Sequence, residues 1–331
     1  MKKLLGFIKG NSILYVAVAG IIAPLVTKNT YFTHMLVMSI MFAILASSLN
    51  IAVGLTGLPN LAHATFFGVG AYVAAILSSR FGVPFYITLI AGGLVATVFG
   101  LILGAPTLRL KGVFLALATI AFGNTMRILE INWISVTNGP MGVTGILPAI
   151  VGGWRFSRTA YIYYGLALLL LSMYITKRIM RSKIGRAFLA IKYDETLARS
   201  MGVNITLYKV GAYVLSACLA GMAGTIYAHY AAFISPDTFT MADSTTVLCM
   251  VILGGTGSVA GPVVGAIILT LAPEILRFAQ LYRIVFIGIL MVVTVIAKER
   301  GWPTIVSDKL NRLFRFSKTR VAEDAENGGG A

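Results

Sequence analysis

The chain has 331 residues and a formal net charge of +16, with 58% hydrophobic and only 11% charged residues. Soluble domains carry about 25% charged residues, so this composition excludes an ordinary soluble fold, and continuous rather than alternating apolar runs disfavour a membrane barrel. We expect an all-α polytopic membrane protein whose positive charge faces anionic lipid at the cytoplasmic surface, and not a protein that binds nucleic acid.

Ten apolar runs have about the length that a helix needs to cross a bilayer. They lie at residues 11–27, 32–53, 61–79, 84–104, 112–131, 159–176, 207–231, 244–256, 260–277 and 281–298. The positive-inside rule places Lys2, Lys3 and Lys9 in the cytoplasm, and counting crossings then predicts that both termini are cytoplasmic. The stretch 17–19 resembles a signal-peptidase site, but the apolar run continues beyond it, which favours an uncleaved first helix.

The segments between and after these runs differ in composition. Residues 1–300 form the predicted transmembrane domain, and residues 301–331 form a basic tail with an interfacial helix and a disordered end. Within the domain, residues 132–158 are rich in Gly, Pro and Asn and indicate an external loop or a re-entrant segment. Residues 177–206 are charged, and we expect a partly helical cytoplasmic loop there.

Glycines interrupt the apolar region at two places. Residues 54–57 and 254–257 share the pattern G-x-T-G, and each lies between two predicted crossings. Non-helical backbone at membrane depth survives only when it is buried in protein or lines a water-filled cavity, and matching breaks in two halves indicate a transport path. Close helix packing is the alternative, and we favour it for Gly261 and Gly265, which stand at i, i+4. At the two G-x-T-G turns we favour a helix break near the pathway.

Polar side chains are few within the predicted crossings. Asn60 and His63 follow the first turn; His63 could be a ligand contact or proton site, but a hydrogen-bonded structural role is favoured. Arg127 and Glu130 can pair at i, i+3 on one helix.

The acidic residues bear on the mechanism. None lies in the middle of a predicted crossing, and Asp237 and Asp243 fall in an external loop. Ion-coupled carriers commonly need a carboxylate at mid-membrane, and the chain has no phosphate-binding loop. The energy for any transport therefore comes from another protein, or transport is passive. Because no cluster of His, Cys or carboxylates is present, the sequence predicts no catalytic residues, no cofactor and no metal.

Several stretches together resemble the LivM type of branched-chain amino acid ABC transporter permeases. They are "SLNIAVGLTGLPNLAHATFFGVGAY" (48–72), "GAPTLRLKGVFLALATIAFG" (104–123), "TNGPMGVTGI" (137–146), "SKIGRAFLAIKYDETLARSMGVN" (182–204), "FISPDTF" (233–239) and "GGTGSVAGPVVGA" (254–266). The resemblance implies a permease domain over residues 1–300 in the bacterial cytoplasmic membrane. It also implies a second homologous permease, two ATP-binding-cassette ATPases and an extracytoplasmic solute-binding protein as partners.

The resemblance also implies roles for two groups of residues. In such importers a short cytoplasmic helix docks on the ATPase, and the residues in that place are Gly185, Arg186, Asp194, Glu195, Ala198 and Gly202. Thr196 departs from the general E-A-A-x-x-x-G pattern, in which a Glu would stand there. A substrate pathway between the two permeases would be lined by Thr56, Gly57, Asn60, His63, Thr256, Gly257 and Ser258.

The solute is less constrained than the mechanism. The expected function is ATP-driven import of branched-chain or other hydrophobic amino acids by alternating access. A permease for urea or short-chain amides is the alternative within the same type. A passive channel or a secondary carrier is the alternative from another class, and neither would need a docking loop.

Overall fold

The computed structural model describes residues 30–275 apart from 108, 109, 111, 152 and 153, together with residues 13, 14, 16–22, 24 and 288. The chain divides into two units, residues 1–278 and 279–331, and the first is described here. The predicted crossing at 281–298, except for Gly288, and the predicted tail at 301–331 lie outside the described residues. The crossing at 11–27 is described only in part.

The first unit is almost entirely helical. Its helices are α2 (Thr30–Leu49), α3 (His63–Phe81), α4 (Phe85–Thr107), α5 (Val113–Asn132), α6 (Ile134–Thr137), α7 (Arg158–Met180), α8 (Lys183–Tyr193), α9 (Glu195–Ser200), α10 (Ile205–Ala231), α11 (Met241–Gly254) and α12 (Gly261–Ile275). A π-helical stretch, η1 (Asn50–Leu55), continues α2, and the short 3-10 turns η2 (Gly139–Met141) and η3 (Pro236–Thr238) lie in loops. Strands β1 (Ile150–Val151) and β2 (Trp154–Arg155) form a small antiparallel hairpin.

Six helices in the described part of the chain are long and apolar enough to cross a membrane: α2 with η1, α3, α4, α5, α7 and α10. Each coincides with a predicted crossing. The crossings predicted at 244–256 and 260–277 correspond to α11 and α12, which have 14 and 15 residues. At 1.5 Å per residue, α11 is about 21 Å long, less than the hydrocarbon thickness of about 30 Å. Helix α11 is therefore shorter than a full crossing, and α12, which is described as far as Ile275, packs against it as the second arm of a hairpin.

Helix α10 is the centre of the bundle and packs against α3 and α4. Small residues permit this contact, because a Cβ added at Gly70 or Gly224 would collide with the backbone of the facing helix. Helices α2 and α7 pack side by side, and Ser172 Oγ donates to Ser47 Oγ at 3.0 Å. Close contacts at glycines thus bring α10 against α3 and α4, and a hydroxyl–hydroxyl bond joins α2 to α7.

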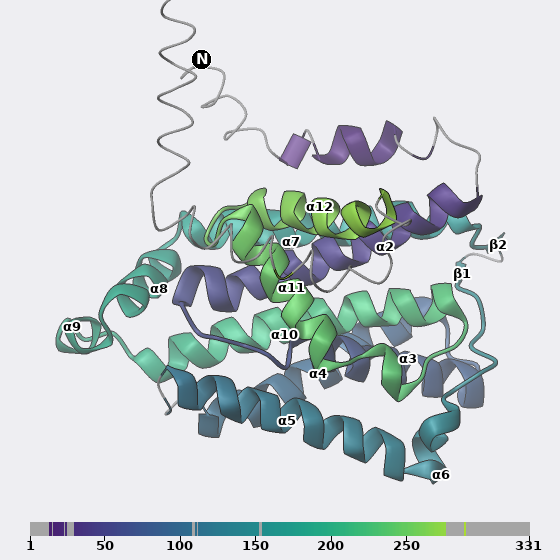
Figure 1. Ribbon diagram of the computed structural model, residues 1–331, viewed down its shortest axis with the longest axis horizontal. Helices are drawn as coiled ribbons and strands as arrows, with labels where there is room; N and C mark the ends of the chain where they lie inside the picture. The colour runs from purple at the N-terminus through teal and green to yellow at the C-terminus, as the bar shows by residue number, and fades with distance from the viewer. Residues whose placement is uncertain are drawn as a thin grey trace, which may run out of the picture. The chain divides into compact units, whose positions relative to one another are not determined.

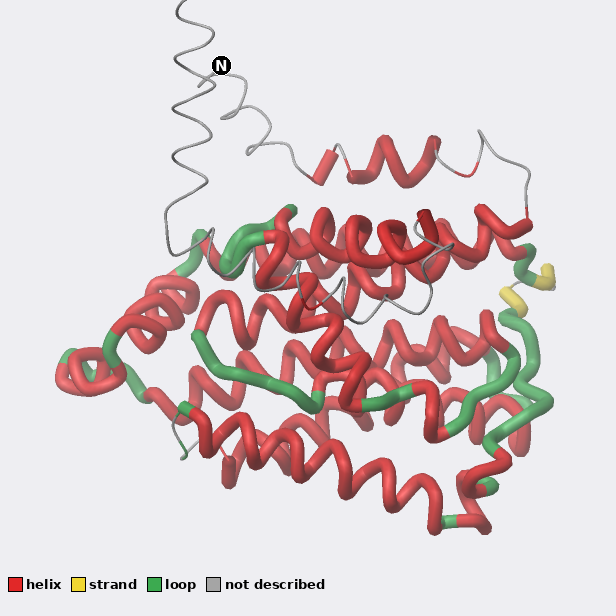
Figure 2. The backbone as a smooth tube through the Cα atoms, viewed as in Figure 1, coloured by secondary structure: helices red, strands yellow, loops and turns green. Residues whose placement is uncertain are grey.

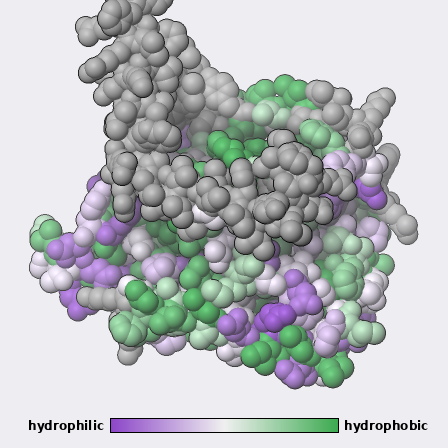
Figure 3. All heavy atoms as spheres, viewed as in Figure 1, coloured by the Kyte–Doolittle hydropathy of each residue, from purple (hydrophilic) through white to green (hydrophobic). Residues whose placement is uncertain are grey.

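The two ends of the bundle differ. Helices α8 and α9 lie at the end where α2 and α7 finish and α10 begins, whereas the β-hairpin and α6 lie at the opposite end (Figure 1). We call these the α8 end and the hairpin end. Hydrophilic residues gather over the projecting α8–α9 region in the space-filling view (Figure 3).

Both predicted helix breaks are present, and both lead to re-entrant backbone. After η1 the chain turns at the α8 end and runs back into the bundle before α3 starts at His63, as the loop in the middle of Figure 2 shows. Helix α11 starts beside the same point, because the Ala64 backbone N–H donates to Ser244 Oγ at 2.9 Å. Helix α3 therefore begins at a buried residue, His63, and the first turn of α11 packs against that start.

Candidate translocation and coupling site

The two G-x-T-G turns meet at the α8 end, although about 200 residues separate them in sequence. The Asn50 side chain joins them: its Oδ1 accepts from the Gly257 backbone N–H at 2.8 Å, and its Nδ2 donates to the Ser258 carbonyl at 2.8 Å. Gly54 lies against the same contact, since a Cβ added there would meet Asn50 and the Gly257 backbone nitrogen. We call this contact between the two turns the turn junction.

Three of the predicted pathway residues have buried side chains with partners inside the chain. The Thr56 hydroxyl donates to the Ala52 carbonyl, Asn60 Oδ1 accepts from the Ala62 N–H at 3.0 Å, and His63 Nε2 lies 2.8 Å from Ser48 Oγ. All three are at most 2% exposed: Thr56 and Asn60 bond to nearby backbone, and His63 joins the start of α3 to Ser48 of α2. Of the predicted set, Gly57 is exposed and Thr256, Gly257 and Ser258 are half-buried.

The re-entrant segment between the first turn and α3 is fixed by neighbouring helices. The Tyr213 hydroxyl of α10 donates to the Pro59 carbonyl at 2.8 Å, and the Leu61 N–H donates to Thr119 Oγ1 of α5 at 3.2 Å. These bonds satisfy backbone groups that have no helical partner at membrane depth. The re-entrant segment is therefore held in place by hydrogen bonds from α10 and α5.

Helices α8 and α9 form the predicted docking segment, and four of its predicted residues build its own shape. Asp194 Oδ1 caps α9 by accepting from the Thr196 and Leu197 N–H groups at 2.8 and 3.0 Å. Glu195 pairs with Lys209 of α10 at 2.5 Å, where the lysine is 2% exposed. The segment is completed by the buried Ala198 and by Gly202, whose φ of +80° ends α9.

The remaining two predicted docking residues have different surroundings. Gly185 is buried where α8 turns against the end of α7, and a Cβ there would collide with the Ile179 carbonyl. Arg186 is exposed. The segment also exposes large apolar side chains: Tyr193 (85%), Leu197 (62%) and Met201 (78%). An apolar surface on a charged, projecting segment is typical of a protein contact.

The Lys192 side chain connects this segment to the turn junction. Lys192, near the end of α8, donates from Nζ to the Gly54 carbonyl at 2.6 Å. A Cβ added at Gly57 would also lie 3.1 Å from Lys192 Cγ. The docking segment and the first turn are thus in direct contact.

One predicted ion pair is wrong. Arg127 pairs with Asp237 at 2.6 Å and not with Glu130, which is buried at 5% exposure. The position of Asp243 is also wrong: the sequence analysis assigned it to an external loop, but it lies in the first turn of α11, beside the start of α3. Within the described part of the chain, no three His, Cys, Asp or Glu side chains are placed to share a metal ion.

Helices α4 and α5 expose faces of different character. Over residues 85–106 the exposed positions of α4 are apolar apart from the Tyr86 hydroxyl near its start. The exposed face of α5 carries Asn124, Thr125 and Asn132 between apolar residues. Thr125 and Asn132 bond to carbonyls of their own helix at 2.9 and 2.8 Å, so Asn124 is the side chain that most distinguishes this face from that of α4.

The chain forms an apolar helix bundle in which two helix breaks meet, and a charged segment projects from one end. These features define a multi-pass membrane protein of the transport class. Residues 31–295 match the family described as the branched-chain amino acid transport system / permease component, and the chain belongs to this family. The resemblance expected from the motifs is therefore confirmed.

Individual relatives agree with the family. The chain is 36% identical over 288 residues to the high-affinity branched-chain amino acid transport system permease protein LivM of Escherichia coli (strain K12), covering 80% of this chain and 68% of that protein. It is 26% identical over 253 residues to the corresponding LivH protein of the same organism, covering 70% and 80%. The probable permease protein LivH of Methanocaldococcus jannaschii is 25% identical over 311 residues, covering 85% and 94%. No solved structure matches the chain.

Proposed function

We propose that this chain is a membrane subunit of an ATP-driven importer of branched-chain or other hydrophobic amino acids. Its relatives are named as permease proteins of branched-chain amino acid transport systems. In this proposal the subunit works in the bacterial cytoplasmic membrane with the α8 end in the cytoplasm. Two separate ATPase subunits supply the energy, and an extracytoplasmic binding protein delivers the solute.

The contact between Lys192 and Gly54 carries the coupling part of the proposal. An ATPase that binds the exposed apolar side chains of α8 and α9 moves the docking segment when ATP binds. Because Lys192 holds the first turn by its carbonyl, that movement reaches the turn junction directly. In this proposal the turn junction is the gate at the α8 end, and its opening releases solute to the cytoplasm. This is alternating access driven by protein motion.

The predicted pathway residues divide into two roles in this mechanism. Gly57, Thr256, Gly257 and Ser258 lie at the accessible side of the turn junction and line the gate. Thr56 and Asn60 support the backbone behind it, and His63 ties the start of α3 to Ser48 of α2.

The second permease subunit belongs on the exposed face of α5. The Asn124 amide on that face would be costly against lipid tails, whereas a partner protein or a water-filled path satisfies it. The apolar face of α4 instead suits lipid. LivM and LivH are both among the relatives, which supports a pair of similar permeases.

Purification and reconstitution test the function. The chain would be isolated from native membranes in mild detergent, its companions identified by mass spectrometry, and the assembly placed in liposomes for uptake of radiolabelled leucine. We expect phosphate-loop ATPases and a second permease in the assembly. We also expect leucine uptake to require ATP on the side of the membrane where the ATPases are bound. Uptake by this chain alone without ATP would overturn the proposal in favour of a channel or carrier, and uptake of urea but not leucine would overturn the solute.

A further inference from the structure

Helix α2 separates two cavities, and its two faces line them separately. Leu36, Ile40 and Ala43 face a cavity of about 320 Å³ that also borders α7 and α12. Met38, Met41, Phe42 and Leu45 face a cavity of about 280 Å³ that borders α3, α10 and the start of α11. Within each set most neighbours are three or four residues apart, which places them on one face of the helix, and the two sets occupy opposite faces.

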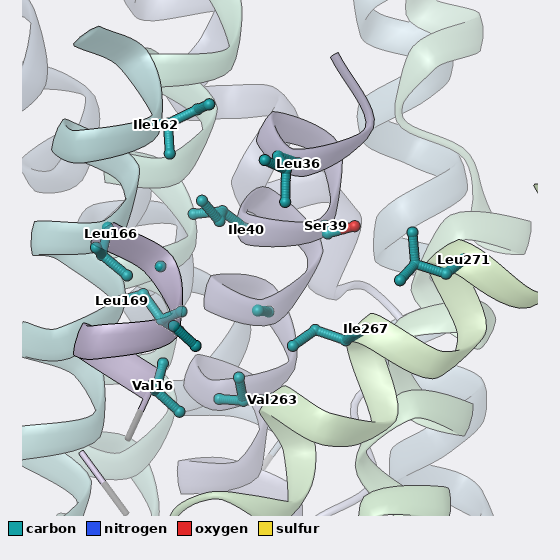
Figure 4. A pocket seen from close by; sticks show the side chains of 13 residues that line it. Val16, Leu36, Ser39, Ile40, Ile162, Leu166, Leu169, Val263, Ile267 and Leu271 are labelled. Carbon is teal, nitrogen blue, oxygen red and sulfur yellow. The ribbon is translucent and has the colours of Figure 1, made fainter. Parts of the chain in front are cut away.

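The first cavity is apolar. Figure 4 shows the aliphatic side chains of α2, α7 and α12 that surround it, and Ser39 is the only polar side chain among its described lining residues. A site of this composition cannot compensate the loss of hydration of a charged group. It therefore does not suit a zwitterionic solute.

The second cavity, which we call the carboxylate cavity, combines an apolar wall with two acidic side chains. Met41, Phe42 and Phe67 supply much of the wall, and Asp237 and Asp243 lie on the side of the α10–α11 connection. Ligand sites commonly have this form, a largely apolar lining with a few placed polar groups. Methionine side chains adapt to irregular apolar ligands.

The two carboxylates are not equivalent. Asp237 is already paired with Arg127 at 2.6 Å. Asp243 is half-buried, and its Oδ2 accepts from the Thr240 backbone N–H at 2.9 Å and from the Thr240 hydroxyl at 2.6 Å. Its Oδ1 accepts no hydrogen bond from the described residues. The capping box thus fixes the orientation of Asp243 and leaves one oxygen available to a cation.

The carboxylate cavity adjoins a larger chamber at the hairpin end. Met38 and Tyr227 line both, and the chamber has a volume of about 670 Å³. It is also lined by Arg158 and His34, and His34 Nδ1 lies 2.8 Å from the Tyr230 hydroxyl. A basic and hydrogen-bonding chamber therefore opens toward the side from which the proposed importer receives its solute.

From this arrangement we propose that the carboxylate cavity is the solute-binding site of this subunit and that it recognises an α-amino acid with a branched apolar side chain. The solute ammonium pairs with Asp243 Oδ1, and its side chain packs against Met41, Phe42 and Phe67. The solute carboxylate faces the adjoining chamber, toward Arg158. This inference rests on the proposed import function and adds the site and the chemical basis of selectivity to it. A neutral solute such as urea makes no use of the Asp243 charge.

Two variants of the complete importer test the site by filling or neutralising it. Met38→Trp fills the passage between the chamber and the carboxylate cavity. Leu36→Trp is its matched control, because Leu36 is also half-buried, lies two residues away on the same helix and faces the apolar cavity. Asp243→Asn removes the charge and retains an oxygen that can accept from Thr240.

The measurements are binding of radiolabelled leucine to the purified permease–ATPase assembly without the binding protein, and ATP-driven leucine uptake by the complete importer in liposomes. We expect Asp243→Asn to weaken leucine binding by about tenfold to a hundredfold, the range for a lost hydrogen bond to a charged group. We expect Met38→Trp to abolish uptake, and Leu36→Trp to bind and transport leucine as the wild type does.

The outcomes separate the site from the function. Wild-type uptake that persists unchanged in Met38→Trp or in Asp243→Asn would overturn the site and leave the importer function standing. Absence of leucine uptake by the wild-type assembly would instead overturn the function. Equal losses in Met38→Trp and Leu36→Trp would also overturn the site, because the effect would then come from distortion of α2.

Discussion

The turn at residues 54–57 and the turn at residues 254–257 have the same pattern and meet at Asn50, yet their surroundings differ. Gly54 lies within a π-helical stretch and packs against a side chain, that of Asn50, as well as the Gly257 backbone. Gly254 ends α11 and packs against the backbone of Gly261 and Pro262.

The second turn is the more rigid of the two. Backbone cannot move aside as a side-chain tip can, so the α11–α12 turn tolerates less change than the first turn does. The first turn is also the one that Lys192 contacts. We infer that the α11–α12 hairpin is the fixed side of the turn junction and that the first turn is the side that moves.

The largest effect is expected from Gly254→Ala. The added Cβ would collide with the Gly261 carbonyl and lie 2.8 Å from the Pro262 nitrogen, so the hairpin must open. Overpacking of this kind costs about 3 kcal/mol or more. Thermal unfolding followed by fluorescence-detected size exclusion should show a large loss of folded protein.

Gly211→Ala is the control for this substitution. Gly211 lies in α10 with no atom within 4 Å of an added Cβ, and Ala is favoured over Gly in a helix by about 1 kcal/mol. The control should be neutral or stabilising. Equal stability of the two variants would contradict the rigid hairpin.

Gly54→Ala should have the second largest effect. The Cβ would displace the Asn50 amide and approach the Gly257 nitrogen at 2.7 Å, but the amide can rotate away. We expect a loss of about 1–3 kcal/mol, smaller than that of Gly254→Ala and accompanied by reduced uptake. Unfolding and uptake measured in parallel provide the comparison, and a loss larger than that of Gly254→Ala would reverse the assignment of the fixed side.

Asn50→Ala removes both bonds across the turn junction without adding volume. It leaves the half-buried Gly257 N–H without its partner, for a cost of about 1–2 kcal/mol. Asn132→Ala is the control, because Asn132 is exposed and bonds only within its own helix, to the Ile128 carbonyl. Thermal midpoints of the two variants that coincide would show that the turns do not depend on Asn50.

Hydropathy alone was sufficient for the long helices. The runs at 159–176 and 207–231 predicted α7 and α10 within a few residues, because a continuous apolar stretch of that length has few alternatives in a bilayer. The glycine pattern likewise predicted both helix breaks. The length of an apolar run and its low charge indicate a helix that spans the bilayer, and the long helices depend on little else.

The depth at which a helix starts within the bundle, and the contacts between residues far apart in the sequence, could not be predicted from hydropathy. The start of α11 at Met241 is set by the capping box of Thr240 and Asp243, and its depth is set by the bond from Ala64 to Ser244. Asp243 was therefore assigned to the wrong environment. The contact from Asn50 to Gly257 spans 207 residues, and no local pattern specifies such a partner.

The smallest effect on stability, and the sharpest on coupling, is expected from Lys192→Met. Lys192 is exposed, so removal of its bond to the Gly54 carbonyl should change the free energy of unfolding by less than about 1 kcal/mol. If the first turn is the moving side, however, the docking segment loses its direct hold on the gate. Leucine uptake per ATP hydrolysed should then fall while ATP hydrolysis and assembly with the ATPase persist.

Lys183→Met is the control, because Lys183 begins the same helix, is exposed and makes no hydrogen bond with the described residues. Uptake per ATP that is the same in both variants would mean that α8 moves the bundle through the end of α7, against which Gly185 packs, and not through the first turn.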